Sequence, residues 1–163
     1  MIMKKLIMAT SIAVFLSLAA SASNKHKLSV SYAVRQNFSG EFPSVKNASW
    51  SEDKGYMVAT FMQDDAVTKA YFNYDGDPVA TVKEMSFTDL PASVQNEIQK
   101  KYSDYTTLQT VQFTDNDSYT ESSVFDVPDE DAKYFVSMAK DNKELIVQVN
   151  ANDEISFFEK MKE

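Results

Sequence analysis

The sequence predicts an α+β protein built from two tandem repeats, each a helical segment followed by antiparallel strands. Two segments carry apolar residues at helical spacing, and each is followed by short runs of strand-forming residues separated by turn signals. Segments 38–50 and 102–113 match at an offset of about 63 residues, and 72–76 matches 149–153 at an offset of 77. We expect the two sets of strands to join into one curved antiparallel surface that packs on the helices.

The first repeat is predicted to span residues 23–87. Its helix should follow Ser29, a residue type that caps helix N-termini, and should end near Gly40 and Pro43. The apolar face of this helix consists of Val30, Ala33, Val34 and Phe38. Strands are expected at 45–51, 56–62, 67–74 and 79–85, and Asp75-Gly76 indicates a tight turn between the last two.

The second repeat is predicted to span residues 88–163. Pro91 suits the first position of its helix, in which Val94, Ile98 and Tyr102 share one face. Strands are expected at 108–114, 134–139, 145–149 and 155–158. An acidic insertion, residues 115–131, separates the first two of these strands and has no counterpart of similar length in the first repeat.

The N-terminal residues 1–22 have the three parts of a secretory signal peptide. Lys4 and Lys5 precede an uncharged apolar run, and Ala20-Ser21-Ala22 supplies the cleavage signal. A transmembrane anchor is disfavoured because the run has about 15 residues, whereas a span needs about 20. We expect a periplasmic or secreted protein, cleaved near Ala22, with no stable membrane anchor afterwards.

Composition excludes several classes of function. The net charge of −8 disfavours nucleic-acid binding, which requires clustered Lys and Arg. The absence of Cys excludes a disulfide framework, a thiolate zinc site and a Cys nucleophile. The single histidine, His26, lies close to the mature N-terminus, where a catalytic base is seldom held in place. We expect a non-enzymatic protein without a cofactor.

Acidic pairs are frequent, but they fall mainly where turns are expected, and Asp favours turns. Asn73, Asp75 and Asp77 alternate as the ligands of a calcium loop do, and Glu84 stands at the twelfth position. Pro78 replaces the glycine that such a loop requires. A hairpin turn explains this segment without metal, and no metal site is expected.

Several short motifs occur in a distinctive order. They are Glu41-Phe42-Pro43 with Trp50 seven residues after the proline, Gly55-Tyr56, the segment 70–76, and Asp89-Leu90-Pro91. In this order they resemble the beta-lactamase-inhibitor-like, PepSY-like periplasmic proteins of Bacteroidetes-type bacteria. The resemblance implies two tandem repeats, each a helical segment on an antiparallel sheet. It implies no catalytic residues, and the inhibitor's target does not follow from a shared fold.

Aromatic and acidic residues supply the candidate contacts. Trp50 is expected to pack the first helix on the sheet, near Phe42 and Tyr56. Tyr71 should lie on the face opposite Phe72, where it would be exposed to a partner. The insertion 115–131 holds acids beside apolar residues, and it is either a solvated loop or a partner-binding arm. The candidate partner-binding residues are Tyr71, Tyr119, Phe125, Asp129, Glu130 and Asp131.

These features favour a secreted, non-enzymatic binding or inhibitor-like module that acts through a curved sheet. Its partner would be another exported protein or a peptide. Two alternatives remain open: a periplasmic carboxylate-based hydrolase, and a carrier of a small ligand or peptide. A hydrolase should bring two acids together in a deep pocket, whereas a binding module should present a shallow aromatic face.

Overall fold

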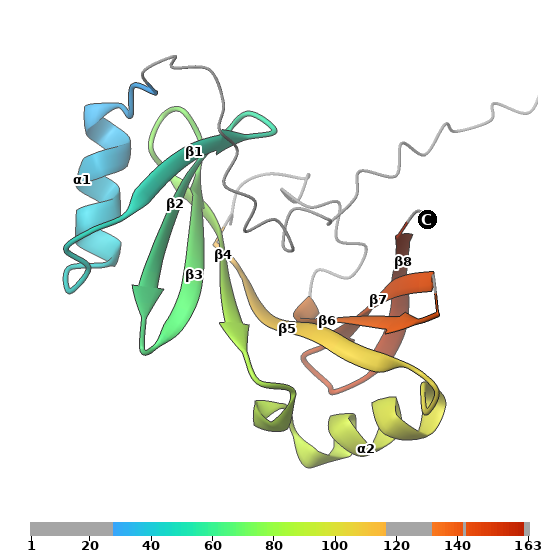
Figure 1. Ribbon diagram of the computed structural model, residues 1–163. Coiled ribbons are helices and arrows are strands. Elements are labelled where there is room, and N and C mark those ends of the chain that lie inside the picture. Colours follow the sequence, from blue (N-terminus) through green and yellow to red (C-terminus); the bar gives the residue numbers. More distant parts are fainter. Residues whose placement is uncertain (1–27, 117–131, 142, 162–163) are drawn as a thin grey trace, which may run out of the picture.

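The computed structural model describes residues 28–116, 132–141 and 143–161. Within these ranges it contains two α-helices, a 3-10 helix and eight strands (Figure 1). The first half comprises α1 (Tyr32–Glu41), β1 (Ser49–Asp53), β2 (Tyr56–Gln63), β3 (Ala66–Phe72) and β4 (Pro78–Met85). The second comprises η2 (Phe87–Asp89), α2 (Ala92–Lys101), β5 (Thr106–Asp115), β6 (Ala132–Lys140), β7 (Lys143–Asn150) and β8 (Ile155–Met161).

The predicted signal peptide 1–22, His26 and nearly all of the insertion lie outside the described residues. None of the helices in the described ranges is long and apolar enough to cross a membrane.

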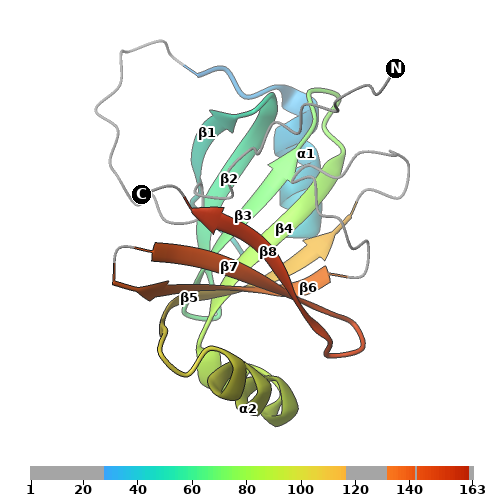
Figure 2. The same cartoon turned by 90° about the vertical axis from the view of Figure 1, so that its right-hand side faces the viewer.

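The fold is α+β, as the sequence predicts. All eight strands form one antiparallel sheet, in which spatial order follows sequence order from β1 to β8. The strands of the first half run steeply in Figure 2, whereas those of the second half run across them. The sheet is therefore open and strongly twisted, which is the usual consequence of right-handed strand twist accumulated over many strands.

Helix α1 begins two residues later than the sequence predicts. Ser31, not Ser29, is the N-cap, and its hydroxyl oxygen accepts a hydrogen bond from the Val34 amide at 3.2 Å. Val30 therefore precedes the helix, although it is buried in the same cluster as Val34. The Phe42 amide donates to the Phe38 carbonyl and closes the last turn.

Both helices cover the same face of the sheet. Val34 and Phe38 of α1 pack on a buried cluster that includes Ala59 of β2 and Phe72 of β3. Helix α2 packs in the same way on β6 and β7, with Val94 and Ile98 as its buried residues. The pairing shows that these two regions lie on one face, because residues directly opposite each other in paired strands point to the same side. The residues that connect the two regions in this way are Ala70, Thr81, Thr114, Thr110, Val136 and Val147.

Trp50 belongs to the cluster under α1, as expected. Its ring lies 5.2 Å from that of Phe38, in an edge-on arrangement, and 6.4 Å from that of Phe72. Phe42 packs on this cluster too, but Tyr56 packs on the opposite face of the sheet. The expectation that Tyr56 supports Trp50 is therefore wrong, because Tyr56 lies opposite Asp53 in the pairing, whereas Trp50 lies opposite Ala59.

The face of the sheet away from the helices, called here the helix-free face, carries a third buried cluster. Its members come from six neighbouring strands: Val58, Tyr71, Val79, Ala80, Val82, Val111, Phe113, Phe135 and Ile146. Tyr56 of β2 and Phe158 of the far edge strand β8 both pack on this cluster. The twisted sheet thus closes its helix-free face around a core of its own.

Two hairpin turns have similar internal hydrogen bonds, each centred on an asparagine side chain. Asn73 Oδ1 accepts from the amides of Gly76 and Asp77, both at 2.9 Å, and Asn73 Nδ2 donates to Asp77 Oδ2 at 3.0 Å. These oxygens stabilise the turn, which accounts for the calcium-like spacing without an ion. Gly76 has a φ of 101°, which favours glycine.

Asn150 occupies the corresponding place in the turn between β7 and β8. Its Oδ1 accepts from the amides of Asn152 and Glu154 at 2.9 and 3.0 Å, and its Nδ2 donates to Glu154 Oε2 at 2.9 Å. Asp153 has a positive φ of 64°, so it adopts the conformation for which a glycine would be expected.

Candidate functional site

Tyr71 is not the exposed contact that the alternation of side chains predicts. It does lie on the face opposite Phe72, but its exposed fraction is only 1%. The physical reason is the twist, which turns this face into a core instead of leaving it open to solvent. Burial, and after it the charge of Asp53, raises the pKa of the Tyr71 phenol far above its usual range. Tyr71 therefore supports the fold and is not accessible to a partner.

The other five sequence-based candidates lie outside the described residues. They are Tyr119, Phe125, Asp129, Glu130 and Asp131. The strand that leads into their segment ends at Asp115, and the strand that follows begins at Ala132. These ends are neighbours, because β5 and β6 pair in antiparallel fashion.

A row of polar side chains crosses the helix-free face beside its apolar cluster. It consists of Lys69 on β3, Glu84 on β4, Gln109 on β5, Ser137 on β6 and Glu144 on β7. Gln109 Nε2 donates to Glu84 Oε1 at 2.8 Å, and Ser137 Oγ donates to Glu144 Oε1 at 3.0 Å. Each carboxylate is thus held by a neutral donor from a neighbouring strand.

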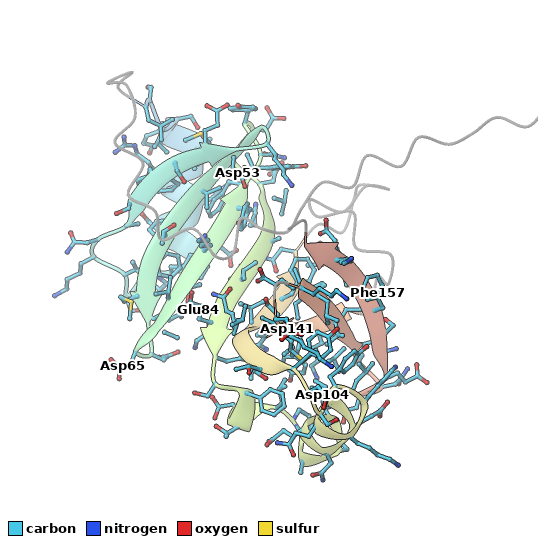
Figure 3. The ribbon with its side chains drawn as sticks, turned by 45° about the vertical axis from the view of Figure 1, so that its right-hand side comes forward. Asp53, Asp65, Glu84, Asp104, Asp141 and Phe157 are labelled. Atoms are coloured by element: carbon cyan, nitrogen blue, oxygen red, sulfur yellow. The ribbon has the colours of Figure 1, made fainter. Side chains whose placement is uncertain are left out.

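Lys69 is the only cation of this polar row. Burial lowers the pKa of its amine, whereas the charges of Glu84 and, to a smaller extent, Asp53 act in the opposite direction. Figure 3 shows that Asp53 and Glu84 lie toward opposite ends of the first four strands. Lys69 therefore lies in a field that two carboxylates on different strands create.

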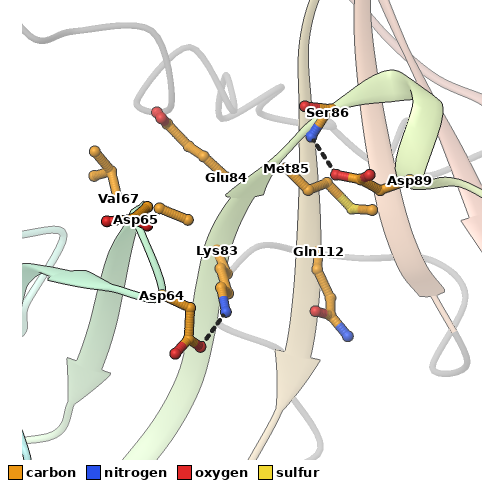
Figure 4. A pocket seen from close by; sticks show the side chains of 10 residues that line it. Asp64, Asp65, Val67, Lys83, Glu84, Met85, Ser86, Asp89 and Gln112 are labelled. Atoms are coloured by element: carbon orange, nitrogen blue, oxygen red, sulfur yellow. Dashed lines mark hydrogen bonds and ion pairs between the residues drawn. The ribbon is translucent and has the colours of Figure 1, made fainter.

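A cleft opens where β3 and β4 part. Their pairing ends at Thr68 and Lys83, although β3 stays paired with β2 through Ala66 and β4 stays paired with β5 through Met85. The space between the separated ends has a volume of about 570 Å³. Figure 4 shows Val67 on one side of it and Glu84 on the other.

Acidic residues dominate this cleft. Asp64 and Asp65, at the turn between β2 and β3, line its mouth together with Glu84 and Asp89. Among the described residues, Lys83 is the only cation that lines it, and it forms an ion pair with Asp64 at 2.8 Å. Asp64 and Asp65 both have positive φ values, 51° and 60°, a conformation that Asp adopts more readily than most residues.

The sequence gives only a partial signal for this cleft. It shows the acidic pair 64–65 between two strand-forming runs, which indicates a turn. It does not show that β4 leaves β3 before β3 ends, because strand separation depends on the twist of the whole sheet. The glutamate at position 84 is marked by the sequence only as part of a calcium-like spacing.

Three of the carboxylates that line the cleft have structural partners. Asp89 Oδ2 accepts from the Ser86 amide at 3.1 Å, Asp64 binds Lys83, and Glu84 binds Gln109. In the described part of the chain, no group of three or more His, Cys, Asp or Glu residues is placed to hold a metal ion. The site is an open, acidic depression beside a strand edge.

No protein-family model matches this chain, and no curated protein sequence matches it either. Solved structures do match. A BLIP-like protein from Bacteroides fragilis NCTC 9343 has a TM-score of 0.65 and 16% identity, with 83% of this chain and 88% of that chain covered. A DUF2874 family protein from Bacteroides ovatus ATCC 8483 also has a TM-score of 0.65 and 16% identity, covering 80% of this chain and 89% of that chain.

A candidate periplasmic protein from Bacteroides eggerthii DSM 20697 matches equally well, with a TM-score of 0.65 and 18% identity over 78% of this chain and 86% of that chain. At these identities the similarity establishes the fold alone. This chain has the fold of BLIP-like and DUF2874 proteins, which agrees with the resemblance to the beta-lactamase-inhibitor-like proteins. The PepSY-like part of that resemblance stays a prediction.

Proposed function

We propose that this protein is an exported, non-enzymatic binding module that recognises another exported protein or a peptide in the periplasm. The observation that carries the proposal is the fold match, over four-fifths of the chain, to a protein described as BLIP-like. The predicted signal peptide, cleaved near Ala22, supports export, and the candidate periplasmic relative supports the compartment.

The proposed binding surface is the part of the helix-free face that the central cluster leaves accessible. Thr60 on β2 and Ser156 on β8 lie toward its two ends, and the polar row crosses it. We include Tyr119, Phe125, Asp129, Glu130 and Asp131 in this proposal because their segment leaves the same sheet between β5 and β6. Acidic residues there would steer a basic partner and raise the association rate at low salt.

The proposal also retains the tandem repeat. Each half has a helix followed by four strands. In the turns at Asn73 and Asn150, the asparagine side chain accepts from the amide four residues on and donates to that residue's carboxylate. Trp50 pairs with Ala59 in the first half, and Thr110 pairs with Val136 in the second. If these two pairs are equivalent, the offset between the halves is 60 residues before the insertion, from Trp50 to Thr110, and 77 after it, from Ala59 to Val136. The first offset replaces the value of about 63 given by the sequence match.

Site-specific photocrosslinking in the producing cells tests the binding surface. A photoreactive amino acid at Thr60 or Ser156 should give adducts with a discrete partner, whereas the same group at Gln36, on the exposed side of α1, should give none. Replacing Asp129, Glu130 and Asp131 with Ser should slow adduct formation at low salt. Equal adducts from Gln36, or none from Thr60 and Ser156, would contradict the proposal.

A further inference from the structure

We propose that the cleft between β3 and β4 is a docking site for an extended, basic segment of a partner polypeptide. The inference rests on the proposed binding function, since it assigns a partner chemistry to a binding module. The cleft adjoins the helix-free face and shares Glu84 with it. Thr60 and Ser156 lie outside the cleft lining and Asp65 lies within it, so the two surfaces can still be tested separately.

Unpaired strand edges are the first part of the argument. Beyond Thr68 and Lys83, β3 and β4 have no ladder pairs with each other in the described chain, although Val67 and Glu84 are both still in strand conformation. Backbone N–H and C=O groups on such an edge are a template for another strand. An extended segment that enters the cleft can therefore form backbone hydrogen bonds with one of these edges, as in β-augmentation.

The size of the cleft limits what can enter. A volume of about 570 Å³ lies within the range of pockets that hold small ligands. This is enough for a short extended peptide with one long side chain, but not for a whole additional strand pair. Val67 and Met85 on the two walls offer apolar contact to the stem of such a side chain.

Charge selects the class of side chain. In the described part of the chain, four carboxylates line the cleft, those of Asp64, Asp65, Glu84 and Asp89, against the single ammonium of Lys83. Lys83 is already paired with Asp64, so the described residues that line the cleft carry a net charge of −3. A Lys or Arg side chain would gain from this field, whereas an acidic segment would be repelled.

Peptide binding to the mature protein tests the inference directly. The probe is a fluorescently labelled, capped hexapeptide of alternating Arg and Val, and the reference is the same peptide with Glu in place of Arg. The Arg peptide should bind, with an affinity that falls as salt increases, and the Glu peptide should not. Equal binding of both peptides would overturn the inference.

Variants locate the binding site. Asp65→Asn combined with Glu84→Gln should weaken the Arg peptide by about tenfold or more. Lys83→Met should instead tighten binding, because it removes the competing ammonium. The matched control is Asp104→Asn, since Asp104 forms an equally short ion pair with Lys140, at 2.8 Å, away from the cleft. Loss of binding in this control, or unchanged binding in the first variant, would overturn the assignment.

Backbone methylation tests the strand pairing. Two methylated peptides are compared, each with N-methyl groups on alternate residues. Binding should be lost when the methylated amides face the protein strand, and kept when the methyl groups are moved by one residue so that these amides face away from it. Amide NMR signals of Val67 and Glu84 should shift with the unmodified peptide. No difference between the two methylation patterns would overturn the strand-pairing part of the inference. Crosslinks from Thr60 with no peptide binding would leave the proposed function standing and remove this site.

Discussion

At the residue scale, Tyr71 makes a pH-dependent contribution to the free energy of unfolding. Its pKa is raised in the folded protein by burial and by Asp53, so folding favours the neutral phenol. This contribution is complete below the unfolded pKa of about 10 and is lost as the pH rises above it. At pH 11 the wild type should therefore lose about 1.4 kcal/mol more stability, relative to pH 8, than Tyr71→Phe does.

Urea denaturation at the two pH values checks this expectation. Tyr32→Phe is the matched control, because Tyr32 is exposed and should leave the wild-type loss unchanged. If Tyr71→Phe loses as much stability as the wild type, the phenol titrates without unfolding and the helix-free face is more open than the structure indicates.

Substitutions at Gly76 and Gly55 distinguish backbone strain from steric clash as causes of lost stability. Both have positive φ, 101° and 86°, so Ala at either position is strained by about 1–2 kcal/mol. Only at Gly76 would the new Cβ meet other atoms, 2.9 Å from the Ala33 carbonyl carbon. Gly76→Ala should therefore cost about 1–3 kcal/mol more than Gly55→Ala in urea denaturation. Equal costs would mean that α1 moves away from the turn without resistance.

At the element scale, local chemistry explains most of what the sequence predicts correctly. The turn at 75–76, the helix after Pro91 and the eight strands all follow from short-range signals, such as alternation and turn-forming residues. The errors fall at element ends. The pattern predicts a strand over 45–51, but β1 begins at Ser49, and the N-cap of α1 is Ser31. Which of two nearby serines caps a helix depends on packing, which a local pattern does not contain.

The two asparagine turns give a prediction at the same scale. Asn73→Ala and Asn150→Ala each remove three side-chain hydrogen bonds from a hairpin, so each should cost about 1–3 kcal/mol. Because the turns belong to different halves, the two losses should add within about 0.5 kcal/mol in the double variant. Thermal or urea unfolding measures both. A cost at one turn only would count against the structural equivalence of the two halves.

At the scale of the whole molecule, the decisive features are those that the sequence could not supply. Alternation places Tyr71 on the correct face, but what covers this face depends on the accumulated twist of eight strands. The cleft has the same origin, because β4 follows β5 and leaves the end of β3 paired with β2 alone. The acids that line it are visible in the sequence, but their convergence is not.

Cooperativity follows from the cluster on the helix-free face. It joins Val58 and Tyr71 of the first half to Phe135 and Ile146 of the second, so the two halves share one core. Trp50, the only tryptophan, reports on the first half, whereas far-UV circular dichroism reports on the whole chain. Shortening Phe135 to Leu should lower the urea midpoint of both signals equally, although Phe135 lies in the other half. If the Trp50 transition keeps its midpoint while the dichroism separates into two steps, the halves unfold independently and the shared core contributes little to stability.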